Sequence, residues 1–259
     1  MDKKELQNPA LYTNRELSWL LFNKRVLSEA RDKQLLLFER LKFLSITASN
    51  LDEFFMVRIG SLVDMIHAEY TKKDIAGMSA KEQLDALMEE THKFAALQYS
   101  TYNRMLLPQL RANGLNFVEH HEQLTERQAQ YVDEYFEENV YPVLTPMAVD
   151  SSRPFPLIRN KTLNIGALVA KKGEKDTEIE FATVQVPSVL PRIIRIPSEE
   201  EGQTTIILLE EIIERHIQKL FKRTVFFSCN EFIGHLIRKP REQPVCQHSS
   251  FSQSGKDNL

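Results

Sequence analysis

The sequence is poor in cysteine, glycine and long apolar runs, and each shortage excludes a class of protein. The 259 residues include two cysteines, Cys229 and Cys246, without a CxxC spacing, so neither a disulfide framework nor a zinc knuckle is predicted. A zinc site combining them with His235 and His248 would not have the usual ligand separations. With only 8 glycines, 11 prolines and no repeat, a fibrous or low-complexity chain is excluded.

No apolar run approaches the roughly 18 residues that a membrane span needs. The opening residues, MDKKELQNPALYTNREL, also lack the apolar middle of a signal peptide. We therefore expect no transmembrane segment and a cytoplasmic location.

Positive charge is scarce over most of the chain. The formal net charge is −3, although the residues from Lys222 onward hold six lysines and arginines against three acidic residues. The body before Lys222 is therefore acidic, which argues against a nucleic acid as partner and limits any polyanion site to a local patch.

The first part of the chain predicts helices. Asn14 can cap a helix that continues to about Asp32, and a longer apolar periodicity runs from about Phe38 to Tyr70. The sequence SAKE at 79–82 is a capping box that opens a third helix, and Gly114 ends it. Three such helices with short connections predict an antiparallel bundle.

After Gly114 the signals become mixed. A capping box, TERQ at 125–128, predicts another helix, and a proline-rich segment follows it. Strand-like runs come next, before a helical run: 162–170, 178–186 and 192–196 for the strands and 208–221 for the helix. The predicted fold class is α+β, with an amino-terminal antiparallel helical bundle followed by an incomplete mixed α/β domain.

One stretch, SITASNLDEFFMVRIGSL at 45–62, carries polar residues where the surrounding helix is apolar. Ser49, Asn50, Asp52 and Glu53 form a polar clump in an apolar helix, and short polar side chains compete there for backbone hydrogen bonds. Either Asn50 bonds its own helix, or the clump forms a notch for a ligand. An amide can donate and accept at once, and it adds no negative charge beside a phosphate.

Several blocks together resemble the long, bacterial-type polyphosphate kinase family. They include NRELSWLLFNKRVLSEA, LKFLSITASNLDEFFMVRIGSL, YFEENVYPVLTPMAVDSSRPFPLIRNKTLNI and FATVQVPSVLPRIIRI, in the family's order, over about residues 12–221. The resemblance implies transfer of the γ-phosphate of ATP onto inorganic polyphosphate. It also implies that residues 1–114 are the helical amino-terminal domain and 115–221 part of the second domain, which makes dimer contacts.

For site residues, the resemblance implies that Asn50 contacts ATP. Arg153, Arg159 and Lys161 in the proline-rich loop are candidates for guiding polyphosphate, with a solvated loop surface as the alternative. The family's phosphorylated histidine and metal ligands lie in later domains, so no catalytic or metal-binding residue is assigned here and Mg²⁺ is expected only with the full-length enzyme. Partners are ATP, polyphosphate and, in the full-length family, a second copy of the chain.

The seven histidines show no acid partner at a recognisable spacing, and none is assigned as a phosphohistidine. Residues 222–259 match nothing expected of the family, and we interpret them as a divergent, out-of-frame tail. This chain alone is therefore predicted to be inactive. The alternative function is a non-catalytic dimerisation or nucleotide-binding module left by gene truncation.

Overall fold

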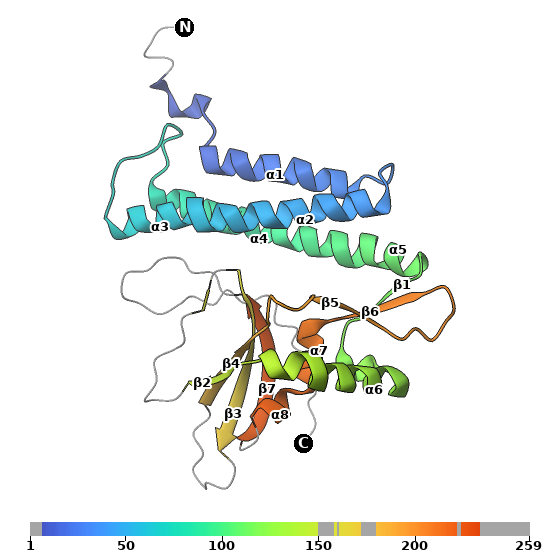
Figure 1. Cartoon of the computed structure of the whole chain (residues 1–259). Helices are drawn as coiled ribbons and strands as arrows, with labels where there is room; N and C mark the ends of the chain where they lie inside the picture. Colours follow the sequence, from blue (N-terminus) through green and yellow to red (C-terminus); the bar gives the residue numbers. More distant parts are fainter. Residues whose placement is uncertain (1–6, 150–157, 160, 172–179, 222–223, 234–259) are drawn as a thin grey trace, which may run out of the picture. The chain divides into compact units, whose positions relative to one another are not determined.

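The structure, a computed structural model, describes residues 7–149, 158–159, 161–171, 180–221 and 224–233. The chain forms two compact units, 1–113 and 114–259 (Figure 1). The domain boundary expected from the sequence, after 114, lies one residue later. The first unit is helical and the second combines helices with two small sheets, so the α+β fold class is confirmed.

The first unit is an antiparallel arrangement of long helices. A short 3-10 turn, η2 (Pro9–Leu11), precedes α1 (Arg15–Arg31), and α2 (Leu37–Phe54) packs along it. The helical path continues through η3 (Phe55–Ile59) and α3 (Gly60–His67), then returns as α4 (Ala80–Thr101), η4 (Tyr102–Leu106) and α5 (Leu107–Ala112) (Figure 1). Within the described residues, none of these helices has the length and apolar character of a membrane span.

The predicted helix starts are confirmed. The side chain of Asn14 accepts hydrogen bonds from the backbone amides of Glu16 and Leu17, and Ser79 and Glu82 form the reciprocal capping box. Asn14 also donates through its amide to Asp74 and Gln83, at 2.7 and 2.9 Å. The α1 cap therefore also ties down the loop before α4.

Three π-helical segments interrupt the helices of the described chain, and two of them end two residues before a proline. The amide of Leu107 donates to the carbonyl of Tyr102, five residues back, one position before Pro108. A proline cannot make the α-helical bond and its ring crowds the carbonyl four residues earlier, which a wider turn relieves. Pro142 follows η6 (Phe136–Val140) in the same way. The third segment, η3, has no proline after it.

The core of the first unit forms two apolar clusters. One gathers Leu20, Phe54, Ile59, Leu62, Ala80 and Leu87, and the other Leu27, Ala30, Leu44, Phe94 and Leu106. On α1 the buried positions are Leu20, Asn23, Leu27 and Ala30, whereas Leu21 is exposed. Trp19 packs against the first of these clusters, and its ring stacks on Phe54 with centroids 4.4 Å apart.

The second unit contains a three-stranded and a four-stranded sheet. The smaller one has the order β1 (Leu115–Val118), β6 (Thr204–Leu208), β5 (Ile193–Ile196), with β1 parallel to β6. The larger one is antiparallel, in the order β2 (Pro146–Val149), β4 (Glu180–Gln185), β3 (Leu163–Lys171), β7 (Thr224–Ile233). The remaining elements are η5 (His121–Gln123), α6 (Glu126–Tyr135), η6, η7 (Tyr141–Val143), α7 (Leu209–Arg215) and α8 (Ile217–Leu220).

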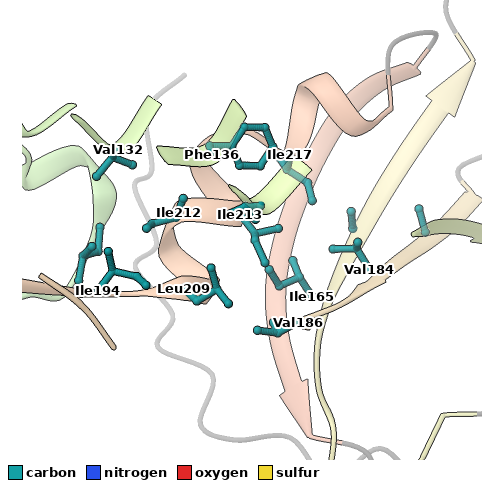
Figure 2. Packing of buried hydrophobic residues seen from close by; sticks show 14 of the residues in the cluster. Val132, Phe136, Ile165, Val184, Val186, Ile194, Leu209, Ile212, Ile213 and Ile217 are labelled. Atoms are coloured by element: carbon teal, nitrogen blue, oxygen red, sulfur yellow. The ribbon is translucent and has the colours of Figure 1, made fainter. Parts of the chain in front are cut away.

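A single apolar core joins these sheets to their helices. Figure 2 shows Val132 and Phe136 facing Ile212, Ile213 and Ile217, with Ile165 and Val184 of the larger sheet beside them. Along β3, Ile165, Ala167 and Val169 are buried while Leu168 is exposed, which is the alternation of a strand with one face on the core. The helices α6 and α7 thus cover one face of the larger sheet.

Two sequence expectations for this unit require correction. The predicted helix 208–221 begins one residue later, after β6, and is interrupted at His216 between α7 and α8. The segment 222–259 was interpreted as a divergent tail, but ten of its residues form β7 and pair along the whole length of β3. The backbone of these residues therefore belongs to the larger sheet.

Candidate functional site

The polar clump lies in the last turns of α2, immediately before η3. Ser49 and Glu53 are exposed, Asn50 and Asp52 are half-buried, and Phe54 is 2% exposed. The helix therefore keeps one face in the core while its polar residues occupy the border of that face. Asn50 is not sealed inside the bundle.

The amide of Asn50 is held by a relay across three helices. Its Nδ2 donates to Oδ1 of Asn23 on α1 at 3.0 Å, and Nδ2 of Asn23 donates to the backbone carbonyl of Thr47 at 3.1 Å. Gln98 on α4 donates to the hydroxyl of Thr47 at 2.9 Å, and that hydroxyl donates to the carbonyl of Leu44 at 2.7 Å. Asn50 therefore bonds a neighbouring helix instead of its own backbone.

The relay also determines which way the Asn50 amide is oriented. A carbonyl can only accept, so Asn23 must turn its NH₂ group toward Thr47 and its oxygen toward Asn50. Asn50 must then use its own NH₂ group on Asn23. Among the described residues, the Oδ1 of Asn50 has no hydrogen-bond partner, which leaves a neutral acceptor at the border of the bundle.

In a regular α-helix, spacings of four and three residues would place Asn50, Phe54 and Val57 on one face as an apolar wall beside the amide, but these residues do not form it. Phe54 is turned into the core against Trp19, whereas Val57 is 48% exposed. The π segment that begins at Phe55 has more residues per turn than an α-helix, so the expected three-and-four spacing no longer places them on one face. The nearby cation, Arg58, lies 3.8 Å from the carboxylate of Glu16.

The basic candidates belong to the second unit. Arg153 lies outside the described residues. Arg159 and Lys161 are both exposed, and Lys161 has a φ of 60°, which forms a turn just before β3. The carbonyl of Arg159 accepts from the hydroxyl of Thr162 at 2.7 Å, fixing that turn. No described carboxylate forms an ion pair with Arg159 or Lys161.

Asn23 and two histidine–carboxylate groups are not predicted from the sequence. Asn23 is fully buried at a position that follows Leu20 by three residues and precedes Leu27 by four, so an amide on the apolar stripe was the available signal. His216 has its Nε2 2.9 Å from Oδ1 of Asp133, and His121 lies beside Glu211. Both acid partners are remote in the sequence, so the absence of a partner at a recognisable spacing did not reveal them.

The pKa values of Asp133 and His216 are both lowered, for different physical reasons. Hydrogen bonding to Arg215 lowers the pKa of Asp133, with Nε of the arginine 2.7 Å from Oδ1. Burial lowers the pKa of His216, whose ring stacks on Phe136 with centroids 4.0 Å apart. Because the imidazole is 5% exposed and packed in this way, we assign it to the core of the second unit.

Comparison with known proteins gives a consistent family. The family model described as polyphosphate kinase N-terminal domain matches residues 12–118, and that of the polyphosphate kinase middle domain matches 127–233. The second match includes β7, so the second domain extends at least to Ile233 and a divergent tail cannot begin at Lys222.

Individual curated proteins similar to this chain are also polyphosphate kinases. The chain is 46% identical over 229 residues to a polyphosphate kinase of Halalkalibacterium halodurans, covering 88% of this chain and 32% of the relative. It is 50% identical over 210 residues to one of Lactiplantibacillus plantarum, covering 81% of this chain and 29% of the relative. The chain thus spans about a third of the length of these curated relatives.

A solved structure supports the same assignment. The crystal structure of polyphosphate kinase from Porphyromonas gingivalis matches with a TM-score of 0.77 and 27% identity, covering 90% of this chain and 34% of that one. Two domain models, the curated relatives and the fold all agree, and the chain belongs to the polyphosphate kinase family.

Proposed function

We propose that this chain supplies the ATP-contacting amino-terminal domain and the second domain of a polyphosphate kinase, which adds phosphate from ATP to a polyphosphate chain and releases ADP. Membership of the family supports the reaction class. The observation that carries the ATP contact is the amide relay, because it leaves the Asn50 oxygen as a fixed acceptor.

Asn50 is chemically suited to a nucleotide. Its oxygen can accept from an adenine amino group or a ribose hydroxyl, and its second N–H can donate to a ring nitrogen or another hydroxyl. Because the amide is neutral, it does not repel the triphosphate, as the carboxylates of Asp52 and Glu53 would. The relay holds the amide in place before the ligand arrives, which reduces the entropy lost on binding.

Arg159 and Lys161, together with Arg153, are proposed to guide the polyphosphate chain. Polyphosphate carries regularly spaced negative charge, and the two described side chains are exposed cations without a described carboxylate partner. ATP is proposed to arrive as its magnesium complex, and the whole enzyme to act as a homodimer in the cytoplasm.

By themselves these residues are proposed not to transfer phosphate. Phosphoryl transfer needs preorganised positive charge around the transferring group. Arg58, eight residues after Asn50, is half-buried and already lies beside Glu16. A nucleotide-binding or dimerisation module is the second candidate function, favoured by the match to the amino-terminal and middle domains alone.

Calorimetric titration of the full chain with ATP tests the contact. Asn50→Ala is expected to weaken binding by about 1 kcal/mol, roughly fivefold in Kd, because one hydrogen bond to the ligand is lost. Ser49→Ala is the matched control, since Ser49 is exposed on the same turn and is expected to keep the wild-type affinity.

The outcomes separate the claims. Equal Kd values for Asn50→Ala and Ser49→Ala would remove Asn50 from the site, and no binding by the wild type would remove the ATP contact from this chain. Formation of ATP from ADP and polyphosphate by the purified chain is expected to be absent. Turnover in that assay would refute the predicted inactivity.

A further inference from the structure

A cluster of one histidine and two glutamates lies in the second unit, between η5 and α7. His121 opens the 3-10 turn that follows β1, and Glu211 and Glu214 lie three residues apart on one face of α7. The two segments pack against each other although some 90 residues separate them in the sequence. The cluster serves no part of the ATP contact proposed for Asn50, and it does not depend on that proposal.

The carboxylate of Glu211 is fixed by the turn that carries the histidine. The backbone N–H of His121 donates to Oε2 of Glu211 at 2.9 Å, and Glu211 is only 8% exposed. A carboxylate oxygen has two lone pairs, so this oxygen can still act as a ligand. The side chain is therefore preorganised against η5.

The imidazole of His121 lies too far from the carboxylate of Glu211 for an ordinary hydrogen bond. Nδ1 of His121 lies 3.5 Å from the same oxygen of Glu211, and it is a buried atom with no hydrogen-bond partner among the described residues. An N–H···O bond would bring the two atoms to about 2.7–3.2 Å. Two ligands of one tetrahedral ion, each about 2.0–2.1 Å from the metal, lie about 3.3–3.4 Å apart. The observed separation fits the second arrangement.

The remaining donors complete the set. One ligand atom from each of His121, Glu211 and Glu214 lies within 4.8 Å of the other two. The Nδ1 of His120 lies 3.8 Å from the other oxygen of Glu211 and is the nearest further donor. On the far side of the ring, a carboxylate oxygen of Glu122 lies 3.6 Å from Nε2 of His121, which favours the proton there and leaves the lone pair on Nδ1.

The charge balance also favours a cation. Glu211 and Glu214 bring two carboxylates to within 4.8 Å of one another, and Glu211 is buried. Two carboxylates this close, one of them buried, repel each other unless a positive charge lies between them.

We propose that His121, Glu211 and Glu214 bind one divalent transition-metal ion of the zinc type, which ties η5 to α7. The class follows from the donor set, because imidazole with carboxylates suits zinc and its neighbours, whereas magnesium and calcium take all-oxygen ligands.

The test uses the full chain, freed of any tag and stripped with a chelator. Titration with Zn²⁺ is expected to show one ion per chain and to raise the Tm. Glu214→Gln keeps the side-chain volume and is expected to weaken Zn²⁺ binding at least about tenfold and to abolish the rise in Tm. Glu138→Gln, which changes an exposed glutamate in the same unit, is the matched control and is expected to behave as the wild type.

Co²⁺ distinguishes this site from the cysteines near the end of the sequence. A histidine–carboxylate site is expected to give ligand-field bands without a thiolate charge-transfer band. That band, with affinity retained in Glu214→Gln, would place the ion on Cys229 or Cys246 and overturn the proposal. Absence of stoichiometric Zn²⁺ binding by the folded wild type would overturn it as well, leaving an acidic surface cluster only.

Discussion

The amide relay predicts a strong energetic coupling between Asn23 and Asn50. In Asn50→Ala, the Oδ1 of the fully buried Asn23 loses its donor, and an unsatisfied buried acceptor costs about 1–3 kcal/mol. In Asn23→Ala, the half-buried Asn50 can turn its free N–H to water, so the penalty comes from the lost bond to Thr47 and the small cavity, about 1–2 kcal/mol. In the double variant Asn23 is gone, and the unsatisfied acceptor disappears with it.

The double variant is therefore expected to lose about 1–3 kcal/mol less than the sum of the two single losses. Urea unfolding followed by tryptophan fluorescence measures this directly, because Trp19 is the single tryptophan of the chain and stacks on Phe54 in the first unit. The signal thus reports the unit that contains the relay. Additivity within about 0.5 kcal/mol would refute the relay and, with it, the orientation of the Asn50 amide.

Two further predictions concern the second unit. Burial lowers the pKa of His216, so the stability that its neutral form contributes is complete above about pH 6.5 and is lost as the pH falls. The wild type should therefore exceed His216→Gln in free energy of unfolding by an amount that shrinks between about pH 7.5 and 5.5. A difference that grows as the pH falls would mean that the ion pair with Asp133 dominates. A chain ending after Phe221 should lose protease resistance in the second unit, because β3 loses its β7 partner, whereas a chain ending after Ile233 should keep it; equal resistance would show that β7 adds nothing.

Local signals in the sequence were sufficient to predict the helix starts. Asn14 and the two capping boxes act within three residues of themselves, so their geometry is written in the adjacent sequence. The strands β3, β4 and β5 were also predictable, because alternation and flanking turns are local. These elements were enough to fix the α+β class.

Elements that depend on distant partners were not predictable. The four residues of β1 form a strand because they pair with β6, nearly ninety residues later. β6 is not predicted either: its apolar run TTIIL has no periodicity of its own, and only its last residue, Leu208, falls within the predicted helix 208–221. For the same reason β7 was assigned to a tail, although it completes the larger sheet.

The candidate site also has one part that the sequence predicts and one part that depends on distant residues. The position of Asn50 was predicted from a polar clump and a resemblance, but its partner Asn23 was not, because the relay joins residues 27 apart on different helices. The partners of the histidines are similarly remote, with Asp133 some 80 residues before His216 and Glu211 some 90 after His121. Spacing in the sequence cannot reveal such pairs.

The π segment after the polar clump links the helix geometry to the site. In the other two π segments of the described chain a proline explains the widened turn, but η3 ends at Gly60 without one. The wider turn changes the rotation of everything after Phe55, so that Val57 faces solvent while Ile59 and Leu62 return to the core. A helix with regular spacing would have placed Val57 beside Asn50 and Phe54. The widened turn therefore leaves Val57 exposed to solvent while Phe54 is buried, and such segments recur at functional sites because they reposition side chains in this manner.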